Sequence, residues 1–483
     1  MILKLLAIHR EFWEEQPALL IGLSFLVGIG AALFSLPLWI VAAWASYTLL
    51  LRKWASCCSV FFIGLYAWLL YSPLPTIDTP AEITAHFSIS SLEPHQSPFY
   101  KDLLYRGTLY WNQAALPCCI YVRPQERIIA SGDYQVTGTL RRRGDYEFTF
   151  RAKHWEPLPW TFSLAELRYQ TKEHLRAFLK IHLPHSATLL SSLATGEVED
   201  RLLRYEFSRL GLQHLLAISG FHFGVLLLFF SFLLGLFLSQ RNIWIALFCL
   251  SIAYFLFIGS SPPVQRAWIT LSLFLLSKLL KRPVQPINLL GTALVLELLW
   301  NPLNASHLSF QLSFASCFGI LLFHSWIDAT LCTLFPKRKM TASASLPLLA
   351  QATYLTSSLF RTAIGIGLAV NITLLPLLLY HFGKFPYLSL LYNLFYPFLL
   401  SFSLFGLLSA LLIVSFLPAA GAVLFSLLDW FTKQLLDLTS YPPLVLDHSL
   451  YFLGLSGDWV AAYFFGLLGV GVYCFSLKED AIV

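Results

Sequence analysis

Residues 212–238 read LQHLLAISGFHFGVLLLFFSFLLGLFL and contain no lysine, arginine, aspartate or glutamate. A run of this length exceeds the roughly 20 residues that an α-helix needs to cross the hydrocarbon core of a bilayer. The whole chain has the same character: 57% of its 483 residues are hydrophobic, only 12% are charged, and its mean hydropathy is +0.67. Soluble domains carry about a quarter charged residues, so a soluble enzyme and a disordered chain are excluded for most of the length. The sequence predicts a polytopic α-helical membrane protein.

Similar apolar runs precede and follow this segment. We expect an N-terminal transmembrane domain in residues 1–72 and the main transmembrane domain in residues 211–483, with about twelve spans in total. The run that begins at Tyr387 is longer than one straight span and contains Pro397, so we expect a break there. The expected segments are Ala18–Phe34, Pro37–Leu51, Cys57–Tyr71, Leu212–Leu238, Ile243–Ile258, Val264–Leu280, Ile287–Trp300, Ser306–Phe323, Thr362–Tyr380, Tyr387–Leu417, Ala419–Leu438 and Trp459–Leu477.

Residues 73–160 have a different composition, with frequent proline, charges of both signs and short β-rich runs. Five such runs separated by turn residues, such as Arg143-Gly144-Asp145, predict a small β-barrel with an OB-like plan. Residues 161–210 are expected to form amphipathic helices, because Leu164–Leu183 is too charged to span and suits the membrane interface. The expected strands are Ile83–Ile89, Leu103–Tyr110, Cys118–Val122, Tyr134–Leu140 and Glu147–Lys153.

Positive charge is distributed unevenly over the short loops between the expected spans. Loops on the cytoplasmic side of a membrane are richer in lysine and arginine. With the N-terminus in the cytoplasm, the outer loops hold only Arg266 and Lys384. This orientation places the β-domain outside the cytoplasm. The inner loops then hold eleven basic residues: Lys4, Arg10, Arg52, Lys53, Arg241, Lys278, Lys281, Arg282, Lys337, Arg338 and Lys339.

Polar and small residues, His214, Ser219, Gly220, His222 and Gly224, interrupt the beginning of the run quoted above. Ser219-Gly220 is expected to break or bend the helix and to free backbone groups for other polar partners. A shared metal ion is excluded, because the two histidines lie about 12 Å apart along a straight helix and metal ligands lie about 2 Å from the ion. The alternative is a structural role, with glycines at helix contacts and hydrogen-bonded histidines.

The same residues carry a resemblance to a known family. Residues 214–224 (HLLAISGFHFG) resemble the signature of the ComEC family, the inner-membrane channels of natural transformation. Other stretches match family elements in the right order, from about residue 190 to residue 397, and the front half of the chain also fits. These stretches are Leu193–Glu197 (LATGE), Ser261–Trp268 (SPPVQRAW), Phe310–Ala315 (FQLSFA), Asn371…Pro376 and Asn393…Pro397.

The resemblance implies a channel of the bacterial inner (cytoplasmic) membrane that imports single-stranded DNA into the cytoplasm, with the β-domain in the periplasm. It also implies partners: membrane lipids, an extracytoplasmic DNA receptor, a cytoplasmic motor or single-strand-binding protein, a separate nuclease and a second copy of the chain. Many family members end in a metallo-β-lactamase-like domain with a His-x-His-x-Asp-His motif. That motif and the Gly-x-x-x-x-Gly-Lys-Ser/Thr phosphate loop are not in this sequence, so we expect no nuclease or ATPase activity, no catalytic residue, no cofactor and no metal.

The implied substrate gives several polar residues a role. Phosphates are costly in hydrocarbon, so a conduit must offer water, hydrogen-bond donors and positive potential without binding the strand tightly. Arg266 follows Pro262-Pro263 at the expected outer start of a helix, where phosphate is favoured; the alternative is an arginine that reaches lipid headgroups. The alternative for Gln311 and Ser313 is interhelical hydrogen bonding. The candidate DNA-path residues are His214, Ser219, Gly220, His222, Gly224, Arg266, Gln311 and Ser313.

The β-domain holds a second candidate site. Arg141, Arg142, Arg143 and Lys153 lie with aromatic residues on one expected hairpin, the combination by which OB-folds bind single strands. The alternative is a solvated hairpin, and the near balance of 13 basic and 11 acidic residues between positions 73 and 185 argues against strong DNA binding. Elsewhere, Glu297 and the series Asp429, Lys433 and Asp437 are assigned structural roles, and the series, spaced four apart, is expected to neutralise itself.

Two other functions stay open. The first is a membrane-embedded enzyme acting on lipid or cell-wall intermediates, with His214, Ser219 and His222 as catalytic residues. Against it, the nearest carboxylate, Glu206, lies eight residues before His214. The second is a small-solute transporter, against which no inverted repeat is visible. The eight cysteines form no metal-binding pattern, and we expect no structural disulfide.

Overall fold

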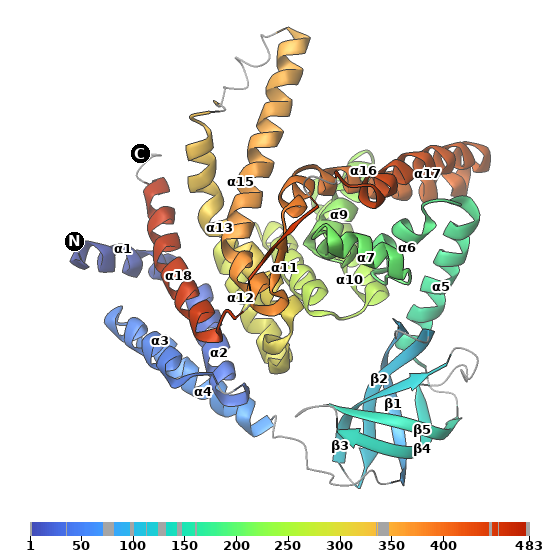
Figure 1. Ribbon diagram of the computed structural model, residues 1–483, viewed down its shortest axis with the longest axis horizontal. Helices are drawn as coiled ribbons and strands as arrows, with labels where there is room; N and C mark the ends of the chain where they lie inside the picture. The colour runs from blue at the N-terminus through green and yellow to red at the C-terminus, as the bar shows by residue number, and fades with distance from the viewer. Residues whose placement is uncertain are drawn as a thin grey trace.

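The computed structural model shows a mostly helical body with a small β-barrel at one side (Figure 1). It describes residues 2–34, 36–70, 82–96, 101–112, 114–123, 132–142, 147–159, 162–334, 336, 347–443, 447–452 and 454–479. A helical protein rich in apolar segments, with one inserted barrel, is the architecture that the sequence predicts, and at this level the prediction is confirmed.

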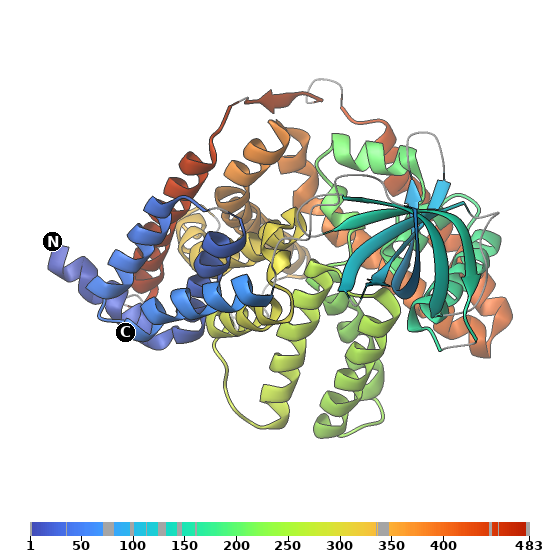
Figure 2. The ribbon, with the colours of Figure 1, turned by 90° about the horizontal axis from the view of Figure 1, so that it is seen from below.

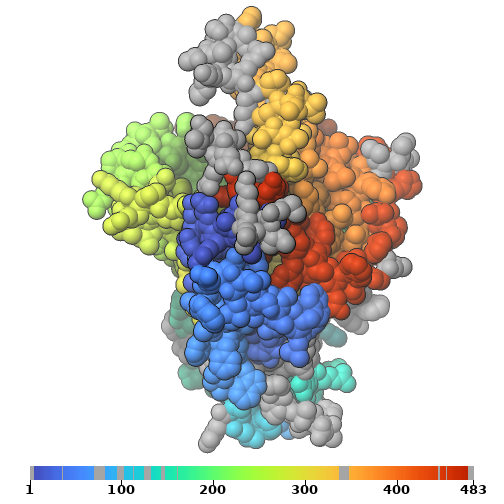
Figure 3. Space-filling view, turned by 90° about the vertical axis from the view of Figure 1, so that its left-hand side faces the viewer, coloured from blue at the N-terminus to red at the C-terminus, as the bar shows by residue number. Residues whose placement is uncertain are grey.

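Among the described residues, four helices precede the barrel; α2, α3 and α4 match the three apolar segments expected there, and α1 is an additional helix. α2 turns away from α1 by 96° at Gln16, and Pro17 opens α2, a position where its missing N–H costs no hydrogen bond. Figure 3 shows these helices (blue) beside α18 (Gly457–Glu479, red), where Phe12 packs edge-on against Phe475. The four are α1 (Ile2–Glu15), α2 (Pro17–Leu33), α3 (Leu38–Leu50) and α4 (Trp54–Leu70).

The barrel closes through the strand order β1-β2-β3-β5-β4. The β3–β5 pair is parallel and the other neighbours are antiparallel. Because successive side chains point to opposite faces of a strand, alternate residues such as Tyr134 and Val136 fill the interior. All five expected strands are present, whereas the turn at Arg143-Gly144-Asp145 lies outside the described residues. The strands are β1 (Glu82–Gln96), β2 (Lys101–Trp111), β3 (Ala114–Val122), β4 (Asp133–Arg142) and β5 (Phe148–Pro157).

Amphipathic helices connect the barrel to the main helical body. α5 (Leu164–His182) begins where the Ser163 side chain accepts a hydrogen bond from the backbone N–H of Glu166 (3.3 Å), so the helix predicted for Leu164–Leu183 is confirmed. Figure 1 shows α5 running from the barrel towards α17 (Pro418–Ser440). Three shorter helices follow: α6 (Ala187–Thr195), α7 (Arg201–Arg209) and α8 (Gln213–Leu216).

The main helical body differs from expectation in two segments. α15 is much longer than the expected Thr362–Tyr380, and its first turns project from the body in Figure 1. The break expected at Pro397 is wrong, because α16 continues through it while Tyr392 and Tyr396 donate hydrogen bonds to backbone carbonyls of α17 (2.8 and 3.0 Å). The other elements are α9 (Gly220–Gly235), α10 (Gln240–Ile258), α11 (Pro262–Leu279), α12 (Pro286–Trp300), the 3-10 helix η2 (Pro302–Ser306), α13 (Leu308–Leu331), α15 (Leu348–Phe382), β6 (Lys384–Pro386), α16 (Leu388–Phe416) and β7 (Ser449–Tyr451).

Among the described residues, five helices, α10, α13, α15, α16 and α18, are long and apolar enough to cross a membrane, and the bent pair α1–α2 passes the same test as one unit. α11 and α17, which coincide with two of the expected spans, do not meet this test, so the count of about twelve spans stays a prediction. Four others, α3, α4, α9 and α12, are apolar but shorter. Figure 2 shows the turn between α11 and α12 at one edge of the body and β7 at the opposite edge. β7 pairs with β6 there, so the ribbon joins the end of α15 to the segment before α18.

Candidate functional site

The helix break expected at Ser219-Gly220 separates α8 from α9. α9 begins at Gly220, and the backbone N–H of Ser219 donates to Nδ1 of His222 across its first turn (3.3 Å). His222 is buried, and its Nε2 has no hydrogen-bond partner among the described residues. His214 and Gly224 are exposed, and a side chain at Gly224 would meet open space. The break therefore holds one histidine inside the protein and leaves the other accessible.

Residues 193–197 meet this break in space. Gly196 ends α6 with φ +76°, a left-handed conformation that side chains other than glycine rarely adopt. A Cβ atom at this position would lie 2.7 Å from Cγ1 of Ile218, inside the segment between α8 and α9. Gly196 is required twice over, by its backbone conformation and by this close approach.

Arg266 of α11 lies beside the same break. Its side chain is buried (8% exposed) and donates from Nε to Oγ of Ser313 (2.7 Å) and from Nη1 to Sγ of Cys317 (3.0 Å), both on α13. A Cβ atom at Gly220 would lie 3.6 Å from Nη2 of Arg266. The structure thus brings three candidate path residues, Gly220, Arg266 and Ser313, into one cluster. Arg266 does not reach the surface, so the alternative of an arginine extended to lipid headgroups is wrong.

Polar groups continue from Arg266 towards one end of α12. Glu297 is fully buried; one of its carboxylate oxygens accepts from Asn304 (3.4 Å), and the other has no partner among the described residues. Asn304 also donates to Gln265, the residue before Arg266 (3.0 Å). An uncompensated carboxylate inside a protein is costly, and Arg266 is the opposite charge within electrostatic reach.

Gln311 forms an interhelical hydrogen bond, which is the alternative to a place in the DNA path. Its Nε2 donates to the carbonyl of Ala305 (3.1 Å), and its Oε1 lies 3.2 Å from Nε2 of His381 on α15. His381 is exposed at the end of α15. Gln311 therefore links α13 to α15 and is not one of the contacts of Arg266.

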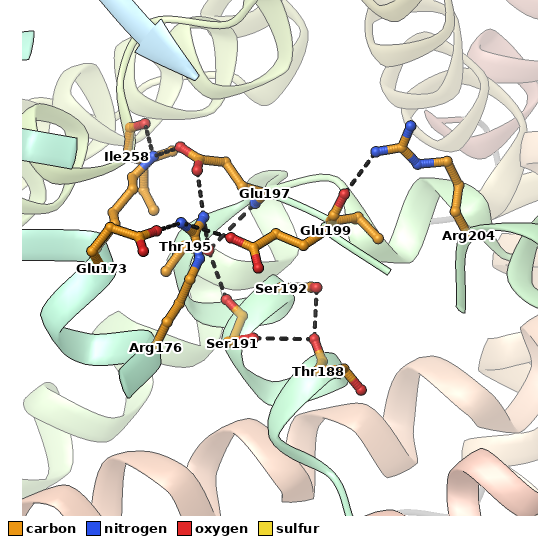
Figure 4. A network of polar contacts seen from close by, with 12 residues as sticks. Glu173, Arg176, Thr188, Ser191, Ser192, Thr195, Glu197, Glu199, Arg204 and Ile258 are labelled. Carbon is orange, nitrogen blue, oxygen red and sulfur yellow. Dashed lines mark hydrogen bonds and ion pairs between the residues drawn. The ribbon is translucent and has the colours of Figure 1, made fainter. Parts of the chain in front are cut away.

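A buried ion network, shown in Figure 4, was not predicted from the sequence. Lys172 of α5 donates to Glu197 (2.6 Å) and to the carbonyl of Ile258 at the end of α10 (2.9 Å). Arg176 pairs with Glu173 and Glu197 and lies 3.0 Å from Glu199. Burial lowers the pKa of Lys172, and the Glu197 carboxylate opposes that shift. The network ties the barrel-bearing helix to the stretch that contacts the α8–α9 break.

Fewer residues of the basic cluster expected on the barrel are free to bind DNA than the sequence suggests. Lys153 pairs with Glu82 (3.0 Å, both exposed), Arg141 is exposed on β4, and Arg142 is half-buried; Arg143 lies outside the described residues. On the barrel surface, His86 instead stacks on its exposed cross-strand neighbour Tyr110 (ring centroids 5.4 Å). All eight cysteines are free, including Cys118, whose pKa burial raises to about 12. Among the described residues, no group of three or more His, Cys, Asp or Glu side chains could hold a metal ion.

The sequence profile of the family described as competence protein matches residues 195–478, more than half of the chain. The chain belongs to the competence protein family. The relative called ComE operon protein 3, from Bacillus subtilis (strain 168), is 28% identical over 344 residues, and the predicted resemblance to the ComEC family is confirmed. The alignment covers 63% of this chain and 39% of the relative, so the chain spans about two fifths of that protein's length. No solved structure matches the chain significantly.

The matched region of this competence protein contains the helix break with the Arg266 cluster and one part of the ion network. It includes Glu197 of the ion network, the break at Ser219-Gly220, and Arg266 with its partners on α13. The barrel and α5 precede residue 195 and lie outside the match. Glu197 connects the two, since it belongs to the matched region and pairs with Lys172 and Arg176 of α5.

Proposed function

We propose that this competence protein is a channel that moves single-stranded DNA across the bacterial inner membrane into the cytoplasm during natural transformation. The observation that supports it best is the placement of Arg266. A permanent positive charge inside an apolar helical body is costly, and it is commonly retained where an ion or a charged substrate passes. Arg266 lies beside a broken helix, where backbone polar groups are free to face water.

The cluster around Arg266 suits passage more than capture. Its partners, Ser313 and Cys317, are neutral and bind a guanidinium weakly enough that a phosphate can replace them. His222 accepts at Nδ1 from a backbone N–H and therefore carries its proton at Nε2 when neutral, as a donor without a fixed charge. Arg266 supplies positive potential, which the nearby Glu297 offsets in part when that side chain is ionised, and the remaining donors supply hydrogen bonds that are easily exchanged.

The proposed topology uses about twelve helices as spans, α2–α4, α9–α13 and α15–α18. α3 has only 13 residues, fewer than the roughly 20 of a straight span. With the N-terminus in the cytoplasm, the barrel, the end of α10 and the β6–β7 ribbon lie on the periplasmic side. Arg241, Lys278, Lys281 and Arg282 then lie on the cytoplasmic side, as the positive-inside rule requires.

We propose the same four-part organisation as the sequence suggests, with membrane helices in residues 1–72 and 211–483, an OB-like domain in residues 73–160 and interfacial helices in residues 161–210. The closed five-stranded order of the barrel supports the OB-like plan. The proposed partners are single-stranded DNA, membrane lipids, a periplasmic DNA receptor, a cytoplasmic motor or single-strand-binding protein, a separate nuclease and a second copy of the chain.

An enzyme built on His214, Ser219 and His222 receives no support from the geometry. His222 contacts the backbone N–H of Ser219 through the nitrogen that would otherwise accept a proton from a nucleophile. No ion pair between either His214 or His222 and a carboxylate occurs within the described residues. No specific observation supports a transporter of small solutes either.

The test is the uptake of labelled DNA by cells that carry Arg266→Gln. Loss of one charge-assisted contact of about 1.5 kcal/mol corresponds to about a tenfold fall in DNase-protected DNA, with surface-bound DNA and membrane abundance unchanged. Arg266→Lys should retain part of the uptake, because it keeps the charge. The control is Lys384→Gln, which removes an exposed lysine of the β6–β7 ribbon. Normal uptake by Arg266→Gln at normal abundance would refute the proposed path.

A further inference from the structure

A hollow of about 310 Å³ lies between the end of α5, the start of α6 and one side of α17. Figure 1 shows this junction, where α5 reaches α17 far from the barrel. The hollow is at the lower end of the size range of small-molecule sites. It is lined by His182, Pro184, His185, Ser426, Asp429, Trp430 and Lys433.

Asp429 uses only one of its two carboxylate oxygens to hold the α5–α6 connection. That oxygen accepts from the side chain of Ser186 (2.7 Å) and from the backbone N–H groups of Ser186 and His185 (2.9 and 3.2 Å). The other oxygen makes no hydrogen bond with a described residue. A negative charge is thus fixed in place with one oxygen free beside the hollow.

Lys433 lies one helical turn after Asp429 and is half-buried. The expectation that Asp429, Lys433 and Asp437 neutralise one another is wrong, because none of them lies within 4 Å of another as an ion pair. Lys433 forms no hydrogen bond or ion pair with any described residue. The hollow therefore presents one unpaired charge of each sign, about one helical turn (5.4 Å) apart along α17.

Two histidines complete the polar wall. The ring of His182 stacks on Phe178 (centroids 4.2 Å), and its Nδ1 is 2.9 Å from the carbonyl of Phe178, so that nitrogen carries the proton. His185 is exposed beside the same connection. Neither ring is paired with Asp429, whose contact with His185 is to its backbone.

An apolar stripe on α17 leads into the hollow. Val423, Leu427 and Trp430 are spaced by four and three residues, so they share one face of the helix, and they are 61%, 59% and 64% exposed. Such a face suits lipid chains. Because Asp429 lies midway along α17, a headgroup held in the hollow would lie deeper than the bulk headgroups, in the polar space at the end of α5.

We propose that this hollow binds the headgroup of an aminophospholipid, phosphatidylethanolamine. Its phosphate would pair with Lys433 and the histidines, and its ammonium group would donate to the free oxygen of Asp429. The acyl chains would lie along Val423, Leu427 and Trp430. A headgroup that carries both charges matches the site better than phosphatidylglycerol, which has no ammonium, or phosphatidylcholine, whose quaternary nitrogen has no N–H to donate.

The experiment is native mass spectrometry of the full chain exchanged between micelles that contain equal amounts of two lipids. The parent protein should retain phosphatidylethanolamine over phosphatidylcholine and over phosphatidylglycerol. Lys433→Gln should retain about tenfold less phosphatidylethanolamine than the parent protein, which is the effect of losing one charge-assisted contact. Lys384→Gln, a lysine on the distant β6–β7 ribbon, is the matched control and should behave as the parent.

The comparison of lipids on the parent protein does not depend on the folding of a variant. Equal retention of phosphatidylethanolamine and phosphatidylcholine would overturn the role of Asp429 as an acceptor. Preference for phosphatidylglycerol would show a simple anion site and would also overturn the proposal. Unchanged retention by Lys433→Gln would place the lipid elsewhere. None of these results depends on DNA transport, so the lipid site and the proposed channel can fail separately.

Discussion

Glu197→Gln tests whether the buried ion network holds the barrel-bearing helix against the α8–α9 break. Glu197 is the shared partner of Lys172 and Arg176, whose side chains are each only 3% exposed, and it is itself 13% exposed. Removing the charge of one partner from a buried ion pair typically destabilises a protein by about 3–5 kcal/mol, because the other charge is left uncompensated. Arg176 keeps Glu173 and Glu199, and Lys172 keeps the carbonyl of Ile258, so we expect about 3 kcal/mol.

Glu199→Gln is the matched control within the same network. Its side chain is 40% exposed and also contacts Arg176, so solvent screens the pair, and the expected cost is below about 1 kcal/mol. The assay is limited proteolysis across residues 157–163 together with thermal unfolding in detergent. Glu197→Gln should be cleaved faster and unfold at lower temperature, whereas Glu199→Gln should resemble the parent and Glu197→Asp should lie between them. Equal behaviour of Glu197→Gln and Glu199→Gln would refute the reasoning.

Two further outcomes follow from single residues. Gly196→Ala should destabilise the protein by at least about 1–2 kcal/mol, since the residue has φ +76° and a Cβ would lie 2.7 Å from Ile218. Thermal unfolding measures this loss, and an unfolding midpoint equal to that of the parent protein would contradict the prediction. The thiol of Cys118 should resist alkylation at pH 9 in the folded protein and react once the protein is unfolded, because burial raises the Cys118 pKa from 9.0 to about 12. A folded state with the raised pKa keeps this thiol protonated, so the stability it contributes is lost as pH rises from 9 to 12; labelling of Cys118 in the folded protein at pH 9 would refute this.

The fold could be predicted wherever a periodic signal was strong. The five strands and the apolar helices are local patterns, and their positions in the sequence agree with the structure. α15 was underestimated because polar residues such as Gln351, Thr353 and Ser357 hide the apolar character of its first turns. The continuity of α16 through Pro397 could not be predicted, because a sequence does not show that Tyr392 and Tyr396, just before the proline, donate hydrogen bonds to α17.

The candidate site was only partly predictable for the same reason. Residues near Ser219 stood out because polar groups are rare in an apolar run. The contact of Gly220 with Arg266 and the pairing of Lys172 with Glu197 join segments 46 and 25 residues apart, and no local pattern reports them. The sequence did carry one signal of this network: Lys172 and Arg176 lie four residues apart and so share one face of α5. If that face is buried, as it is in the structure, both cations need a carboxylate partner.

The central claim is that this chain forms a path for single-stranded DNA, and transport by the purified full chain in liposomes tests it most directly. Vesicles would enclose a fluorescent probe complementary to an oligonucleotide added outside, with an inward-negative or inward-positive potential imposed. The account predicts a signal from the parent protein that falls about tenfold with Arg266→Gln and stays at the parental level with Lys384→Gln. No signal above that of protein-free vesicles under either potential, or equal signals from the parent and Arg266→Gln, would contradict the account.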